Sequence, residues 1–174
     1  TENIEIEEGS EENWRSCFDT ALKHLWCDWH VDNVDNHNVG APREASAVGA
    51  RRGASSDSLG GLATIDKDHP LFCPKHTGED PKSYHRGDSW FWINNIAAVS
   101  MLRLDPNHYE EYIRAITRAS TLDLFQGQIS GHASELSSAS SFSPAGSPFQ
   151  AWSEATLIEL IDELETQNFI DEGE

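Results

Sequence analysis

Hydrophobic residues recur at helical spacing in several parts of the chain. Residues 89–104 are apolar nearly all round, which predicts a helix buried on most sides. Residues 11–26 predict an amphipathic helix that Ser10 caps. The apolar positions of that helix are Trp14, Cys17, Phe18, Ala21, Leu22, Leu25 and Trp26.

Two further helices follow from their start signals and apolar stripes. Asp105 as N-cap and Pro106 at the first helical position predict a helix to about residue 119, forming an antiparallel hairpin with 89–104. Its stripe is Tyr109, Tyr112, Ile113 and Ile116. Ser147 and Gln150 form a capping box around Pro148, which predicts a last helix to about residue 165. Its inward positions should be Ala151, Trp152, Ala155, Ile158, Ile161 and Leu164.

The remaining segments carry weaker signals. We expect a short extended segment over 62–73, a loop over 75–88, one or two further helical turns in 120–128 and a Ser-rich loop over 130–148. The polar stretch 28–61 has no period, although 44–50 is a candidate short helix. No β-alternating run appears, so the fold class is mainly α. The domain prediction is, in chain order, an acidic tail over 1–9, a helix with a polar loop or linker over 10–61, a helical part over 62–166 and an acidic tail over 167–174.

Composition fits one domain and excludes some partners. The chain has 174 residues, 37% of them hydrophobic, and a formal charge of -18 from 30 acidic and 12 basic residues. Such a field repels phosphate backbones and anionic lipid, so we expect no nucleic-acid and no membrane partner. The acidic surface with only four Lys suits a halophilic, archaeal, cytoplasmic protein, and an ordinary acidic bacterial protein is the alternative.

The cysteines, the start of the chain and the motifs for metal and nucleotide binding restrict the class of protein further. Three Cys without a C-x-x-C pair do not form a disulfide framework, and the acidic start of the chain is unlike a signal peptide. His69, Cys73 and His76 lie close together, but their spacing is not that of a zinc site, and residues 28–38 do not match an EF-hand. Nucleotide and serine-hydrolase motifs are absent. We therefore expect no metal and no cofactor.

Three spaced segments combine a Gly or Pro break with polar groups and an aromatic ring, the mixture that a sugar site needs. They are 84–90 (YHRGDSW), 131–135 (GHASE) and 147–153 (SPFQAWS). Each also has a plainer interpretation. Glu135 is one of 30 acids, most of which are solvated surface charges, Asp88 suits an N-cap, and Trp90 suits a core position.

The order and spacing of these segments resemble the C-terminal part of the amylo-alpha-1,6-glucosidase domain of glycogen debranching enzymes. That family has the motifs Tyr-His-x-Gly-x-x-Trp, Gly-x-x-x-Glu and Gln-Ala-Trp-Ser, in this order, and a segment upstream of them that looks like 62–70. The matching positions are Tyr84, His85, Gly87, Trp90, Gly131, Glu135 and 150–153. The resemblance covers about residues 60–165 and implies an (α/α)6 barrel.

The resemblance also implies a reaction. Glu135 would be the general base in an inverting hydrolysis of α-1,6-glucosidic branches in a glycogen-type glucan, with a second carboxylate as general acid. The family's acid, an Asp in the upstream half of the barrel, matches no residue here. The glucose-binding or water-orienting side chains would be Tyr84, His85, Arg86, Asp88, Trp90, Gln150 and Trp152.

The number of helices limits what this chain can form. A barrel of twelve helices needs about 200 residues, whereas four clear helices are predicted here. We therefore expect a partial (α/α)6 barrel that acts on an α-glucan or oligosaccharide. The chain would be a fragment, one product of a split gene that an N-terminal half-barrel polypeptide completes, or a remnant. The alternatives are a non-catalytic helical module that binds carbohydrate or a partner, and a related (α/α)6 glucosidase of the glucoamylase or trehalase type.

Overall fold

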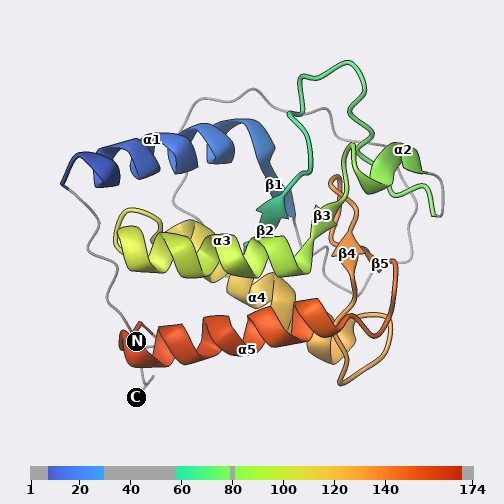
Figure 1. Ribbon diagram of the computed structural model, residues 1–174. Helices are drawn as coiled ribbons and strands as arrows, with labels where there is room; N and C mark the ends of the chain where they lie inside the picture. The colour runs from blue at the N-terminus through green and yellow to red at the C-terminus, as the bar shows by residue number, and fades with distance from the viewer. Residues whose placement is uncertain (1–7, 30–57, 79–80, 170–174) are drawn as a thin grey trace.

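The computed structural model describes residues 8–29, 58–78 and 81–169 and is mainly helical, which confirms the predicted class (Figure 1). Over half of the described residues lie in helices. These are α1 (Glu8–Leu25), α2 (Pro81–Tyr84), α3 (Phe91–Leu104), α4 (Glu110–Gln126) and α5 (Ala151–Thr166). A barrel-like arrangement of these helices stays a prediction.

Helix α3 lies at the centre, and its buried Asn95 connects it to α4 and α5. The Asn95 Oδ1 accepts the Ser120 hydroxyl at 2.6 Å, and its Nδ2 donates to the Ser153 carbonyl at 3.3 Å and to the Thr156 hydroxyl at 3.2 Å. Further along, Arg103 binds Glu163 at 2.6 Å. The α3–α5 contacts near both ends of the two helices join residues that are 58 to 61 positions apart in the chain. Because this separation stays nearly constant along the helices, α3 and α5 run in the same direction (Figure 1).

The main apolar core lies between α1, α3, α4 and α5. Its fully buried members include Met101, Leu102, Tyr109, Ile113, Ile116 and Leu160. The predicted stripe of the 106–119 helix is therefore confirmed, since Tyr109, Ile113 and Ile116 are buried. On α1, by contrast, Leu22 is buried but Trp14 is 54% exposed, so the predicted stripe faces inward only toward its C-terminal half.

Short antiparallel strands appear that the pattern of residues did not predict. β1 (Trp26–Trp29) pairs with β2 (Leu59–Leu62), and a second sheet has the order β3 (Ser89–Trp90), β4 (Leu136–Ser137) and β5 (Pro144–Ala145). Strands of two to four residues are too short for alternation to be visible. Of the expected extended segment 62–73, only its first residue lies in a strand.

Two predicted helix starts in the middle of the chain are wrong. Asp88 does not cap α3, whose N-cap is Trp90, because residues 89–90 pair as β3 and Asp88 is buried elsewhere. Asp105 caps the end of α3, and its Oδ1 accepts the His108 amide at 3.1 Å, so the chain turns before α4 begins at Glu110. The extra helical turns expected over 120–128 are the continuation of α4 to Gln126.

The start and the inward face of the last helix also differ from the prediction. The capping box does not form, because the Gln150 side chain and the Ser147 amide both donate to Glu135, and α5 begins at Ala151. The buried face consists of Ser153, Leu157, Leu160 and Leu164. Of the six positions expected inside, only Leu164 is buried.

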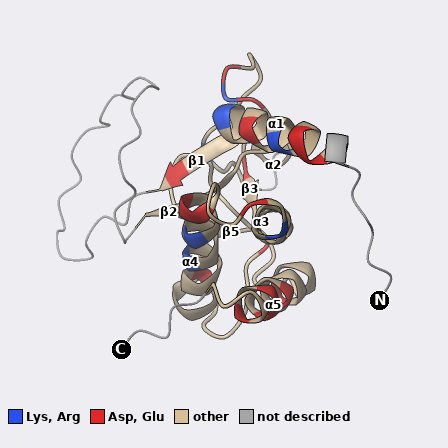
Figure 2. Ribbon diagram, turned by 90° about the vertical axis from the view of Figure 1, so that its left-hand side faces the viewer, with Lys and Arg blue, Asp and Glu red and all other residues tan. Residues whose placement is uncertain are grey.

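Figure 2 shows acidic positions on α1 and α5, with basic positions on α1 and α4.

The candidate helix 44–50 lies outside the described residues. Within the described part of the chain, every helix is too short or too polar to cross a bilayer.

Candidate functional site at Glu135

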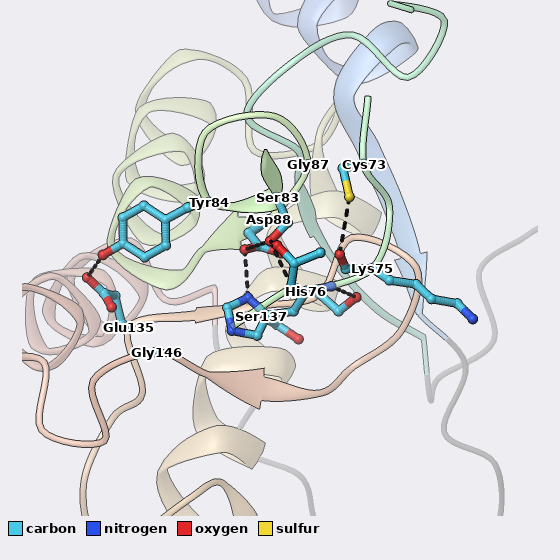
Figure 3. A network of polar contacts seen from close by, with 12 residues as sticks. Cys73, Lys75, His76, Ser83, Tyr84, Gly87, Asp88, Glu135, Ser137 and Gly146 are labelled. Carbon is cyan, nitrogen blue, oxygen red and sulfur yellow. Dashed lines mark hydrogen bonds and ion pairs between the residues drawn. The ribbon is translucent and has the colours of Figure 1, made fainter. Parts of the chain in front are cut away.

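The Glu135 carboxylate accepts hydrogen bonds from each of the other two segments that the sequence singled out, and Figure 3 shows the bond from Tyr84. The Tyr84 hydroxyl donates to Oε1, and the Gln150 amide donates to the same oxygen at 3.2 Å. The Ser147 backbone amide donates to Oε2 at 3.0 Å. Three donors from two distant loops thus fix both oxygens of one half-buried carboxylate.

Backbone bonds bring the segments together. Trp90 pairs with Leu136 in the β3–β4 ladder, which places 84–90 beside 131–135. The Glu135 amide donates to the Ser147 carbonyl at 2.9 Å, and the Phe91 amide donates to the Glu135 carbonyl at 3.3 Å. The loop of Glu135 therefore lies at the N-terminal end of α3, where the helix dipole favours negative charge.

Gly146 is required beside the carboxylate. Its φ of +74° is in the left-handed region, and a Cβ at this position would lie 2.9 Å from the Glu135 Cβ. A side chain here would therefore displace either the turn or Glu135.

Tyr84 is held as a neutral donor. Its ring packs edge-on against Trp90, with centroids 4.5 Å apart, and the Trp90 indole donates to the Tyr84 carbonyl at 3.0 Å. Burial, and then the hydrogen bond to Glu135, raise the pKa of Tyr84 to about 12. The hydroxyl is therefore protonated at neutral pH and donates to the carboxylate.

The other predicted residues of the first segment surround Tyr84. His85 is exposed and stacks on Trp90, with ring centroids 5.9 Å apart, whereas Trp90 itself is only 9% exposed. Arg86 connects two loops through its backbone, because its carbonyl accepts the Cys73 amide at 2.6 Å. His85 is thus open to solvent, and Trp90 forms the wall behind it.

Asp88 is fully buried and lies next to Ser83 and His76, to one side of the Tyr84–Glu135 contact (Figure 3). Its Oδ2 accepts the Ser83 hydroxyl at 2.9 Å and lies 2.7 Å from the His76 Nδ1. The backbone amide of His76 donates to the Ser138 hydroxyl at 3.2 Å. This network connects the loops on both sides of Tyr84, so the geometry favours a positioning role for Asp88 over direct contact with a ligand.

Trp152 lies in the first turn of α5 and is 63% exposed, with its ring edge-on to Trp92 at 5.6 Å. Of the predicted aromatic side chains, Trp152 and His85 are the exposed ones. His69, Cys73 and His76 make separate local contacts, and the described residues contain no group of three His, Cys, Asp or Glu side chains arranged to hold a metal ion.

Sequence reasoning missed several residues that build the site. Ser147 acts through a backbone amide and Gly146 through its lack of a side chain, and neither contribution has a pattern of its own in the sequence. Asp123 and Glu154, from α4 and α5, accept the amides of Ser134 and Ala133. The arrangement supplies one oriented carboxylate, suited to accept a proton from a water molecule or a hydroxyl group.

A family model described as amylo-alpha-1,6-glucosidase matches residues 58–159, which is more than half of the chain. No curated protein and no solved structure gives a significant match.

Proposed function

Because the chain belongs to the amylo-alpha-1,6-glucosidase family, we propose that it forms the base-bearing part of a glycoside hydrolase that cleaves α-1,6-glucosidic branch linkages. The family points to glycosidase-type enzymes in general. The observation that carries the finer proposal is the convergence of Tyr84, Ser147 and Gln150 on Glu135. A surface carboxylate without a role would not need donors from two distant loops.

In this proposal Glu135 takes a proton from water as the water attacks the anomeric carbon, and a second carboxylate protonates the leaving oxygen. An inverting enzyme keeps its two carboxyl groups about 6.5 to 9.5 Å apart so that the water fits between them. The fixed hydrogen bonds orient Glu135 before substrate arrives, which lowers the reorganisation needed during the reaction.

The exposed side chains around the carboxylate suit a sugar ligand. Trp152 and His85 present open rings, on which the apolar face of a glucose ring would lie, and Gln150 and Arg86 add polar groups beside them. Tyr84 would contact both Glu135 and the sugar. Asp88 and Trp90 would act indirectly, by holding the loop of Tyr84 in place.

The general acid is proposed to come from an N-terminal half-barrel polypeptide. Apolar side chains on α3 and α5 support such a partner, because Ile93, Ile96 and Ile158 are 38%, 43% and 68% exposed. Neighbouring helices of a barrel would cover these positions.

The test is the variant Glu135→Gln, assayed for glucose release from a branched dextrin with the half-barrel polypeptide present. The rate should fall by about a hundredfold or more while binding of maltooligosaccharide, measured by calorimetry, stays unchanged. Glu159→Gln, an exposed acid on α5, is the matched control and should keep the full rate. A Glu135→Gln rate above about a tenth of wild type would remove Glu135 from the base role.

A non-catalytic carbohydrate-binding module is the second candidate, and the lack of an assigned acid among the described residues favours it. Wild-type protein that binds maltooligosaccharide but releases no glucose, with or without the half-barrel polypeptide, would support this candidate.

A further inference from the structure

The four consecutive backbone amides that lead to Glu135 each have a different acceptor. For residues 132 to 135, these are the Ile129 carbonyl at 3.1 Å, a Glu154 carboxylate oxygen at 3.3 Å, the Asp123 Oδ2 at 2.7 Å and the Ser147 carbonyl at 2.9 Å. The bond from Ser134 to Asp123 is the shortest, and both residues are buried. A short bond to a buried carboxylate is the strongest kind among these four.

Asp123 is an unusual residue for its position. It is 0% exposed near the end of α4, and among the described residues its Oδ1 has no hydrogen-bond partner. Burial raises its pKa, an effect that the hydrogen bonding of Ser134 opposes. A buried carboxylate with one good donor stabilises a fold less than an apolar side chain of the same size would. The presence of Asp123 is therefore better explained by the Ser134 amide that it holds than by a contribution to the stability of the fold.

The backbone around Asp123 is shaped to let the carboxylate reach the loop. The Gly127 amide donates to the Asp123 carbonyl at 2.7 Å and ends α4, and a Cβ on Gly127 would clash with the Asp123 Oδ1. The Gly131 amide then donates to the Leu124 carbonyl at 2.7 Å, which folds the chain back over this end of the helix. The loop thus crosses directly over the buried carboxylate.

We infer that Asp123 is a positioning residue of the Glu135 site: its carboxylate holds the Ser134 amide and so determines where the adjoining Glu135 lies. The catalytic consequence rests on the proposed function, but the contact itself does not. The rival explanation is a purely structural Asp123 whose loss would destabilise the whole fold without a specific effect on the loop.

Amide hydrogen exchange followed by NMR separates the two explanations. Asp123→Leu gives a larger, branched apolar side chain and removes the acceptor, so exchange at Ser134 should accelerate at least about tenfold more than exchange at amides inside α4. Asp123→Asn keeps a weaker, neutral acceptor and should give an increase of a few-fold. Thr117→Ala, which removes a hydroxyl that donates to the Ile113 carbonyl within α4, is the control and should leave the Ser134 ratio unchanged.

Equal acceleration at Ser134 and at the α4 amides in both Asp123 variants would overturn the inference. If Asp123→Leu does not fold, the increase in Asp123→Asn decides the question alone. In an active assembly, Asp123→Leu should lower kcat about tenfold with KM within about twofold, and Asp123→Asn should restore most of kcat. If the wild type hydrolyses nothing, the proposed function fails, while the exchange result still decides the role of Asp123.

Discussion

The Tyr84 hydroxyl donates a hydrogen bond to the Glu135 Oε1, although 51 positions separate the two residues in the chain. The β3–β4 pairing makes this contact possible, because it places the loop of Tyr84 directly beside that of Glu135. The phenol is a neutral donor, so it orients the carboxylate without neutralising its charge.

Tyr84→Phe should reduce the stability of the protein in a way that depends on pH. The pKa of Tyr84 is raised to about 12 by burial and by Glu135, against about 10 in an unfolded chain. Its contribution is therefore complete below pH of about 10 and is lost as pH rises toward about 12. Urea unfolding of wild type and variant should show a free-energy difference that changes across this interval. A difference that is constant from pH 8 to 12 would contradict the assigned contact.

Gly146→Ala should destabilise the protein more than Gly131→Ala does. Both glycines have positive φ, +74° and +88°, so both substitutions cost about 1 kcal/mol of backbone strain. Only at Gly146 does the new methyl meet Glu135, whereas nothing lies within 4 Å at Gly131. Chemical denaturation of the two variants measures the difference, and Gly146→Ala should also lower glucose release. Equal losses of stability would show that the turn at Gly146 tolerates the methyl group.

Leu160→Ala should cost about 2 to 5 kcal/mol of unfolding free energy, because Leu160 is fully buried between the helices. Ile158→Ala should cost less than about 0.5 kcal/mol, because Ile158 is 68% exposed on the same helix. Thermal or urea unfolding of the two single variants tests the face of α5 that the structure assigns. If Ile158→Ala lowered the unfolding free energy more than Leu160→Ala does, the inward face predicted from the sequence would be correct instead.

Helices could be predicted where apolar residues dominate, and the C-terminal ends of α3 and α5 agree with the prediction to within one residue, but the starts of α3, α4 and α5 could not be predicted. The segment 91–104 and the stripe with Ile113 and Ile116 were clear, since burial on several sides leaves a dense apolar pattern. Asp105 and Ser147 have the right chemistry for N-caps, but one closes a turn and the other binds Glu135 through its backbone. At Ser147 a tertiary contact overrode the local preference, whereas at Asp105 a local turn comes before the helix.

The prediction of the inward face of α5 was wrong for a related reason. Ala151, Ile158 and Ile161 are apolar and exposed, so hydrophobicity alone could not distinguish the packed face from the uncovered one. Ser153 is polar and buried, and its carbonyl accepts a hydrogen bond from the buried Asn95 of α3.

The candidate site followed from three short motifs, because loops that carry chemistry retain unusual residue combinations. The backbone amide of Ser147 and the supporting carboxylate of Asp123 could not be found in that way, since a single acid among 30 has no distinguishing pattern. The halophilic, archaeal and cytoplasmic assignments, the specific glucan and the half-barrel partner stay predictions.

The Asn95 contacts define the smallest unit that would have to be transplanted to move this site into another protein. One amide on α3 binds both α4 and α5, and α5 begins at the residue after Gln150, while α4 carries Asp123. Grafting only the three loops onto a foreign scaffold would leave each loop with its own orientation. A graft that keeps α3, α4 and α5 with Asn95, Ser120 and Thr156 would carry the relative placement of the loops with it.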